Sequence, residues 1–295
     1  MTLNKSNKWS TKMAYKKILL AINVYEKADV VINSAVDFAK KNNADVLKVV
    51  TVIDCVAPFA PSIVDFQHSI EEEAKVALDK VIKKIDGKHL DGVQIKHEVL
   101  VGNPASEIVA YADESNCDLI VLGSHATHGV NLLLGSVANT VLHKAKCDVL
   151  TVRVCDDETL SSRAHGYKKI LAPSDLEGDS CYVVSKAAEV AKLYNGKLDT
   201  AFVIPNDSIS LMTYETDKVE GALEKFASAN GINGEKSVLI GGIANSILEK
   251  AKENGNDLIV VGSHRRGAIG RFFLGSTANS ILHEANMDVL VVRLK

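Results

Sequence analysis

The chain has 295 residues, of which 46% are hydrophobic and 24% charged, and its formal net charge is -3. These values are typical of a globular protein with room for two domains, and they exclude a disordered or collagen-like chain. The weak net charge and the absence of a Lys/Arg-rich block argue against nucleic acid as a partner.

The five cysteines are odd in number and never form a CxxC pair. They argue against a disulfide framework or a zinc site and favour a cytoplasmic location, with Cys117 and Cys147 as small core residues. No apolar run is long enough to cross a membrane, so no membrane partner is expected. Residues 1–14 are predicted to form a polar N-terminal extension.

In chain order, short apolar runs alternate with amphipathic segments whose apolar residues recur at helical spacing. Helices are expected at residues 28–43, 70–87 and 104–116, where Pro104 suits a first helical turn. Strands are expected at residues 17–22, 45–52, 93–101, 118–123 and 148–154 in the first half, and at 169–174, 197–204, 236–240, 257–262 and 288–294 in the second.

Two long passages of the sequence are copies of each other. Residues 123–153 and 262–293 align with a single one-residue gap, and Tyr15–Asn23 matches Tyr167–Asp175. A repeat of about 140 residues is too long for a solenoid and indicates a duplicated domain. The expected organisation is an extension at 1–14, a first domain at 15–154, a linker at 155–166 and a second domain at 167–295.

The alternation of strands and helices predicts a doubly wound α/β fold in each copy, with a five-stranded parallel sheet covered on both faces. Such sheets bind ligands beyond the carboxyl ends of their strands, at the switch point in strand order. There each copy carries Gly-Ser-His after the fourth strand and Gly-Ser before the last helix. Glycines and first-turn amides suit a phosphate, and Ser136 or Ser276 can cap the helix; ordinary capping explains the same residues equally well.

Taken together, these features resemble the universal stress protein family. Its nucleotide-binding members share a glycine, two residues, a second glycine, nine residues and then Gly-Ser or Gly-Thr, with an aspartate ending the first strand. The resemblance covers nearly everything after Tyr15, so the chain resembles a tandem universal stress protein. It implies two Rossmann-like domains of the adenine nucleotide alpha hydrolase type, packed as a pseudo-dimer, that bind ATP with Mg²⁺.

The second copy matches the family pattern better than the first. Its Asp175 stands where the family's aspartate contacts adenine. Arg265 replaces the second glycine, and with Arg266 and Arg271 it either supplies positive charge to phosphates or is a solvated surface residue. The resemblance implies a nucleotide site at Asp175, Gly262, Arg265, Gly275, Ser276 and Thr277.

The first copy departs further from the pattern. Asn23 replaces the aspartate, Ala126 replaces the second glycine, and the loop is one residue short. An amide is a weaker acceptor than a carboxylate, so this copy is expected to bind nucleotide weakly or not at all. Its candidate residues are Asn23, Gly123, Gly135 and Ser136.

The remaining polar candidates favour binding over catalysis. The pairs His125/His128 and His143/His283 lack further ligands at metal spacing, and no side chain is an evident general base, so neither a metal site nor an enzyme is expected beyond slow ATP hydrolysis. The family resemblance implies a role in stress tolerance through regulation of partners. The alternative is a non-nucleotide stress protein that serves as a protein-interaction or small-ligand scaffold.

The last strand of each copy is an apolar run that contains an arginine, Arg153 or Arg293. An edge strand must be covered or paired. The resemblance implies that the two last strands pair antiparallel within the chain, and a homodimer of tandem chains is a further expectation. The two arginines are interpreted as edge charges.

Overall fold

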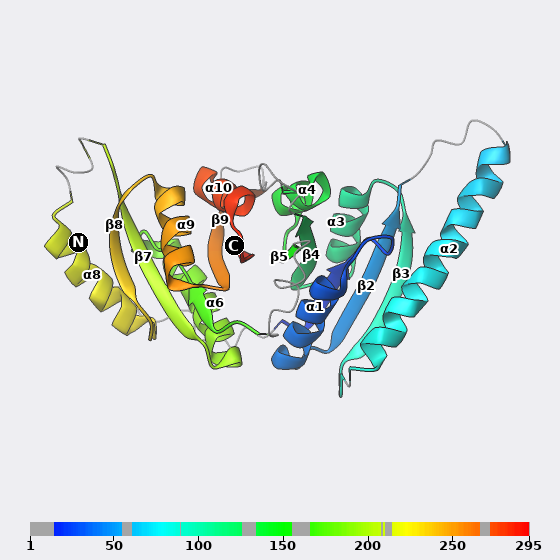
Figure 1. The fold of residues 1–295 in the computed structure, drawn as a ribbon, viewed down its shortest axis with the longest axis horizontal. Coiled ribbons are helices and arrows are strands. Elements are labelled where there is room, and N and C mark those ends of the chain that lie inside the picture. The colour runs from blue at the N-terminus through cyan, green and yellow to red at the C-terminus, as the bar shows by residue number, and fades with distance from the viewer. Residues whose placement is uncertain are drawn as a thin grey trace. The chain divides into compact units, whose positions relative to one another are not determined.

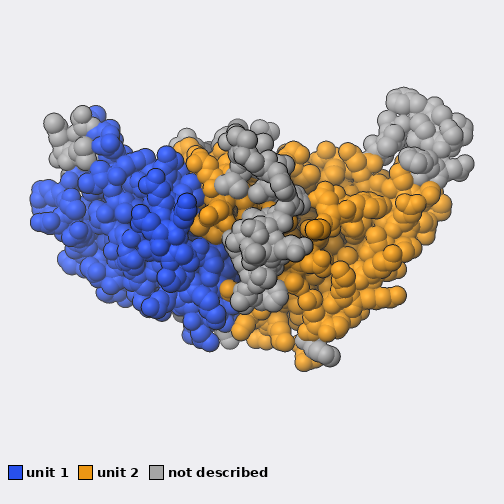
Figure 2. All heavy atoms as spheres, in the orientation of Figure 1, with its two compact units in different colours: residues 1–14, 167–262, 294 blue, residues 15–166, 263–293, 295 orange. Residues whose placement is uncertain are grey.

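The computed structural model describes residues 15–54, 61–88, 90–125, 134–154, 166–207, 209, 214–265 and 272–294. The predicted extension at 1–14 and most of the predicted linker, residues 155–165, lie outside this range. The chain divides into two compact units (Figure 2). The larger unit holds residues 15–166 and 263–293, and the smaller unit holds residues 167–262 and Leu294.

The sheet of the larger unit has the strand order of a doubly wound fold. Its first five strands are parallel in the order β3-β2-β1-β4-β5, and β11 from the second repeat pairs antiparallel with β5 (Figure 1). The predicted parallel sheet is therefore confirmed. These strands are β1 (Lys17–Ala21), β2 (Val46–Ile53), β3 (Gln94–Val101), β4 (Leu119–His125), β5 (Asp148–Val154) and β11 (Asp288–Arg293).

The helices of the larger unit connect these strands. Strand order reverses between β1 and β4, and right-handed crossovers put α1 and α2 on one face of the sheet and α3 and α4 on the other, where α3 and α4 pack together. The helices are α1 (Asp29–Asn42), α2 (Pro61–Asp86), α3 (Pro104–Glu114) and α4 (Ser136–Lys144), joined from the second repeat by β10 (Phe272–Phe273) and α10 (Ser276–Glu284).

Local sequence explains two of these helices. In α1 the side chains of Val31, Ile32, Ala35 and Ala39 recur at helical spacing and are buried. At the start of α3 the Asn103 side chain accepts a hydrogen bond from the Ser106 amide at 3.1 Å, and the prediction that Pro104 opens this helix is confirmed. Helix α2 begins nine residues before the predicted start at residue 70.

The smaller unit repeats the same plan. Its strands are parallel in the order β9-β6-β7-β8. An aspartate side chain holds the start of the first strand in each unit. Asp118 accepts hydrogen bonds from the backbone amides of residues 16 and 17, both at 2.8 Å, and Asp257 accepts from those of residues 168 and 169. The elements are β6 (Lys169–Leu171), α6 (Gly178–Tyr194), β7 (Lys197–Pro205), α8 (Thr216–Ala229), β8 (Lys236–Gly241), α9 (Ile243–Asn254) and β9 (Leu258–Arg265), of which residues 258–262 belong to this unit.

Candidate functional site

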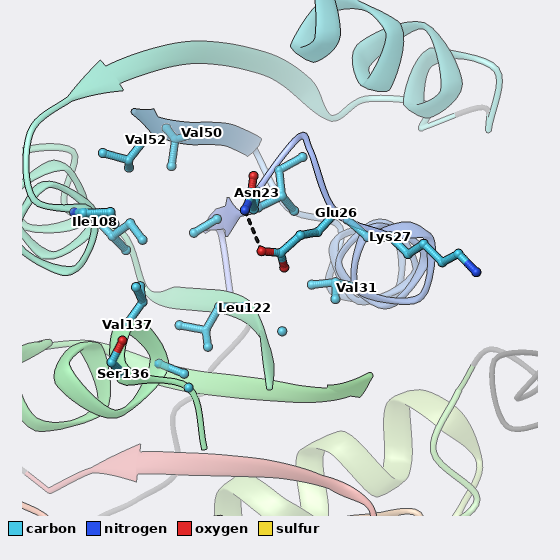
Figure 3. Close-up of a pocket in the computed structure, with 17 residues that line it drawn as sticks. Asn23, Glu26, Lys27, Val31, Val50, Val52, Ile108, Leu122, Ser136 and Val137 are labelled. Atoms are coloured by element: carbon cyan, nitrogen blue, oxygen red, sulfur yellow. Dashed lines mark hydrogen bonds between the residues drawn. The ribbon is translucent and has the colours of Figure 1, made fainter. Parts of the chain in front are cut away.

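A cavity of about 270 Å³ opens at the carboxyl ends of β1, β2 and β4 in the larger unit (Figure 3). This is the point at which strand order reverses, and it is where open α/β sheets place their ligands. The side chains of Val50, Val52, Ile108 and Leu122 form apolar walls. The cavity is therefore an apolar slot with polar groups at its ends, which is the ordinary character of a small-molecule site.

Four residues that the sequence singles out in the first repeat line this one cavity. They are Asn23, Gly123, Gly135 and Ser136. They come from three separate segments: the turn after β1, the end of β4 and the start of α4. The structure thus brings Asn23 together with residues that lie 100 or more positions further along the chain.

The Asn23 side chain holds the turn after β1. Its Oδ1 accepts a hydrogen bond from the Tyr25 amide at 3.1 Å, and its Nδ2 donates to Oε1 of Glu26 at 2.6 Å. In the second repeat Oδ1 of Asp175 accepts from the Glu177 amide at 3.0 Å. Both residues therefore form the same side-chain turn, which fixes the oxygen that accepts from the backbone amide and so orients the side chain.

The glycines of the motif are not all required by packing. A Cβ on Gly123 would lie 3.1 Å from Cγ2 of Val31, and one on Gly262 would lie 2.8 Å from Cγ2 of Val183, so these positions are glycine because a helix packs closely against the strand. A Cβ on Gly135 would meet nothing within 4 Å, and its φ of -57° is open to any residue. The packing of the chain therefore does not require a glycine at 135.

The amino end of α4 faces the cavity without a side-chain cap. Gly135 is the N-cap residue and Ser136 is the first helical residue, and neither α4 nor α10 has a capping side chain within the described residues. The expectation that Ser136 or Ser276 caps its helix is wrong, because each serine lies one position too far along the chain. The first-turn amides of α4 have no acceptor within the helix and carry the positive end of its dipole.

The predicted residues of the second repeat divide between the two units. Asp175 and Gly262 belong to the smaller unit, whereas Gly275, Ser276 and Thr277 begin α10 in the larger unit. Arg265 ends β9, where its backbone pairs with Phe272. The Arg265 side chain lies outside the described part of the chain, as do the whole residues Ala126, His128, Arg266 and Arg271.

Sequence reasoning missed Glu26 and Lys27, which also line the cavity. Figure 3 shows the Glu26 carboxylate directed into the cavity toward Asn23, while the Lys27 side chain extends away from it. Glu26 follows Asn23 by three residues, and the alignment of the repeats puts Gly178 opposite it. That difference between the repeats is the signal that points to Glu26.

Burial bears on two other predictions, those for two arginines and two cysteines. Arg153 and Arg293 are 4% and 2% exposed, so they are buried groups and the interpretation as edge charges is wrong. The Arg293 guanidinium donates to the carbonyls of Cys147 and Leu142, which explains why burial is tolerated. Cys117 is buried, as expected of a core residue, whereas Cys147 is half-buried. Burial raises the pKa of the Cys117 thiol to about 11 and that of the Cys147 thiol to about 12.

His143 lies in α4 beside charged neighbours. Burial, followed by the charges of Arg293 and His283, lowers its pKa, and a hydrogen bond with Asn279 opposes this shift. The side chain of His125 is not described. Among the described residues no three His, Cys, Asp or Glu side chains gather as a metal site, and no helix is long and apolar enough to span a membrane.

The fold defines a tandem, doubly wound α/β protein, and its larger unit has a cavity at the switch point of the sheet. The Universal stress protein family model matches residues 14–153 and again residues 166–293. Universal stress protein A homolog 1 of Coxiella burnetii is 40% identical over 152 residues, which cover 48% of this chain and 97% of that protein. The chain therefore belongs to the universal stress protein family and carries two family domains in tandem.

The solved structures agree with this fold. A universal stress protein from Archaeoglobus fulgidus is 23% identical, with a TM-score of 0.72, and the match covers 95% of this chain and 99% of that one.

A second sequence relative again matches the length of a single repeat. Universal stress protein A homolog 2 of Coxiella burnetii is 31% identical over 147 residues, which cover 48% of this chain and 96% of that protein.

Proposed function

We propose that this universal stress protein binds an adenine nucleotide and acts in stress tolerance by regulating partners, without being an enzyme. The observation that carries the proposal is the cavity of the larger unit, which brings together Asn23, Gly123, Gly135 and Ser136 at the switch point of the sheet. The motif residues that the sequence resemblance associates with nucleotide binding thus line a single apolar slot.

Each end of the cavity suits a different part of a nucleotide. Val50, Val52 and Ile108 offer apolar surface to the faces of a base, and the Asn23 amide can hydrogen-bond its edge. At the other end, the uncapped amides of α4 suit a phosphate. Gly135 supports this assignment, because it leaves open space that packing of the chain does not use.

We extend the proposal to the second repeat, whose Asp175, Gly262, Gly275 and Ser276 occupy the matching sequence positions. A carboxylate is a stronger hydrogen-bond acceptor than an amide. We therefore propose this repeat as the tighter site for ATP, with Mg²⁺ as the accompanying ion, and Arg265 as a cation near the phosphates.

We also propose that the repeats 15–154 and 167–295 associate through their last strands. Supporting this, Leu150 of β5 pairs with Leu290 of β11. The two strands also exchange equivalent hydrogen bonds. The backbone amide of Arg153 donates to the Asp288 side chain, and that of Arg293 donates to the Asp148 side chain, both at 2.8 Å. A cytoplasmic location stays a prediction. So does a homodimer of tandem chains, which a measurement of the mass of the native protein in solution would test.

The test is titration calorimetry of the full chain with ATP and AMP, with native mass spectrometry to count bound ligands. Gly135→Val fills the open space at the start of α4 and should abolish the first-repeat signal without unfolding the chain. Gly221→Ala, a helical glycine with equally open surroundings, is the matched control and should bind as the wild type does.

Asp175→Ala should remove the second-repeat signal in the same assay. No binding by the wild type at millimolar nucleotide would overturn the proposal and leave the scaffold function as the better one. Binding that survives Gly135→Val, Asn23→Ala and Asp175→Ala would place the ligand elsewhere on the chain.

A further inference from the structure

Strand β3 is the outermost strand of the sheet in the larger unit. Within the described ranges it pairs with β2 alone, and it stands at the end of the strand order (Figure 1). Its central residues Lys96, His97 and Glu98 are exposed. An edge strand of this kind presents backbone groups with which a further strand can pair.

The outward backbone groups of β3 belong to its odd-numbered residues. The amides of Gln94 and of Gly102, just beyond the strand, both donate to carbonyls on the β2 side. In a parallel pair the amide and the carbonyl of one residue point to the same side, and that side alternates along the strand. Ile95, His97 and Val99 therefore direct their amides and carbonyls away from β2.

These outward groups fit an antiparallel copy of the same strand. When His97 lies opposite His97 of a second copy, the two residues exchange amide-to-carbonyl hydrogen bonds, as in any hydrogen-bonded antiparallel pair. Ile95 then lies opposite Val99 of the second copy. That pair also has its backbone groups directed outward, and it brings two apolar side chains together.

The charges of β3 are complementary in this register. Lys96 lies opposite Glu98 of the second copy, and the two-fold axis through the His97 pair repeats this contact on the other side. Both are non-hydrogen-bonded positions, where facing side chains approach most closely, so opposite charges stabilise the pairing. Charged residues on an edge discourage pairing with most other strands. The order Lys-His-Glu instead favours an antiparallel copy of itself.

Helix α2 packs against β3 and adds an exposed apolar side chain beside the edge. The Asp79 carboxylate lies 3.3 Å from Nε2 of His97, so this side of α2 faces the edge strand. Val76 is one turn earlier on the same side, and it is 55% exposed. An antiparallel continuation of the sheet puts both copies of α2 on one face, with Val76 on the side of the junction.

We propose that the exposed edge of β3 is a self-pairing surface, through which two copies of this chain join antiparallel about His97. The inference goes beyond the proposed function, because the described lining of the cavity holds no residue of β3. Strands β5 and β11 already pair antiparallel in the larger unit, so this sheet accepts the same kind of junction.

The test measures the mass of the full chain by sedimentation equilibrium over a series of concentrations at low salt. The wild type should dimerise. Lys96→Glu and Glu98→Lys each put like charges opposite one another on both sides of His97, so each should weaken dimerisation about tenfold or more. The variant with both changes restores the opposite charges in reversed order and should dimerise as the wild type does.

A mixture of the two single variants tests the register itself. Lys96→Glu has two acidic side chains at these positions and Glu98→Lys has two basic ones, so the mixture should form a mixed dimer although neither variant pairs with itself. Lys252→Glu, which changes an exposed lysine of α9, is the matched control. It should leave dimerisation unchanged.

Three results would overturn the β3 surface: a wild type that stays monomeric, single variants that dimerise as the wild type does, or a mixture that forms no mixed dimer. The proposed function is tested separately. Lys96→Glu should bind ATP as the wild type does, because Lys96 is not among the residues that line the cavity. A failure of self-pairing therefore leaves nucleotide binding untouched, and a failure of nucleotide binding leaves the β3 surface untouched.

Discussion

The turn after β1 and the turn after β6 begin alike and then place their carboxylates differently. Asn23 and Asp175 make the same bond to the amide two residues on, at 3.1 and 3.0 Å. In the first repeat the negative charge comes three residues later, at Glu26, where the second repeat has Gly178. Helix α6 begins at Gly178, whereas α1 begins only at Asp29.

This comparison shows how a duplicated domain can keep the bond that holds a turn while the residues beside it change. The bond that holds the turn needs only an oxygen two residues before an amide, which Asn and Asp both supply. The next carboxylate differs between the repeats: Glu26 accepts from Asn23 Nδ2 at 2.6 Å, and the second repeat has Gly178 at that position. The two repeats therefore keep the bond that holds the turn and differ in the charge beside it.

The largest expected effect concerns the paired last strands. Asp148 accepts from the Tyr15 hydroxyl at 2.7 Å and from the Arg293 amide at 2.8 Å, and it is buried. Asp148→Ala should cost about 3 kcal/mol of unfolding free energy, because it leaves two buried donors without this acceptor. The measurement is urea denaturation followed by circular dichroism.

Asp45→Ala is the control for that variant. Its carboxylate is 70% exposed and pairs with Lys16 at 3.6 Å, so the loss should be below about 1 kcal/mol. Equal losses for the two variants would mean that the junction of β5 and β11 does not contribute to the stability of the chain.

The second effect compares the two packing glycines. A Cβ would lie 2.8 Å from Val183 at Gly262 and 3.1 Å from Val31 at Gly123. Gly262→Ala should cost about 2 kcal/mol and Gly123→Ala about 1 kcal/mol, since overpacking rises steeply with overlap. Thermal unfolding measures both, and a reversed order would show that the backbone near Gly262 yields more readily.

The third effect exchanges the turn residues themselves. The double variant Asn23→Asp with Glu26→Gly gives the first repeat the residues of the second. Its cavity should bind adenine nucleotides about threefold more tightly, because a carboxylate is a stronger hydrogen-bond acceptor than the amide that it replaces. Calorimetry measures this affinity, with Gly135→Val as the blank, and an unchanged affinity would show that the turn after β1 does not contact the nucleotide.

The smallest effect is a pH dependence at His143. Burial, Arg293 and His283 lower its pKa in the folded state below the ordinary value of 6.5. The unfolded chain therefore binds the proton more readily, and the contribution of neutral His143 to stability is complete above pH 6.5 and is lost as the pH falls toward the lowered pKa.

His143→Gln should accordingly lose less thermal stability between pH 7.5 and 5.5 than the wild type does. Melting temperatures at the two pH values measure the difference. A variant as acid-sensitive as the wild type would show that other groups cause the loss.

The sequence by itself determined the duplication, the alternation of strands and helices and the residues that meet at the switch point. These follow from patterns that one segment carries alone: the apolar runs of buried strands, the helical spacing of Val31 and Ala35, and Pro104 after Asn103. Gly123, Gly135 and Ser136 were predictable together because the carboxyl ends of neighbouring parallel strands meet at one edge, and Asn23 was predictable because the family resemblance implies a contact at its position.

Only the tertiary structure decided which of these residues serve packing and what charge the cavity carries. Gly123 is explained by the approach of Val31 from another segment, while Gly135 has no such neighbour. The burial of Arg293 and the place of β11 beside β5 likewise depend on contacts between segments far apart in sequence. The direction of Glu26 depends on how the turn after β1 folds, where its carboxylate accepts from Asn23. Residue patterns specify local structure, but the burial of a polar side chain and its direction are set by the neighbours that the fold brings to it.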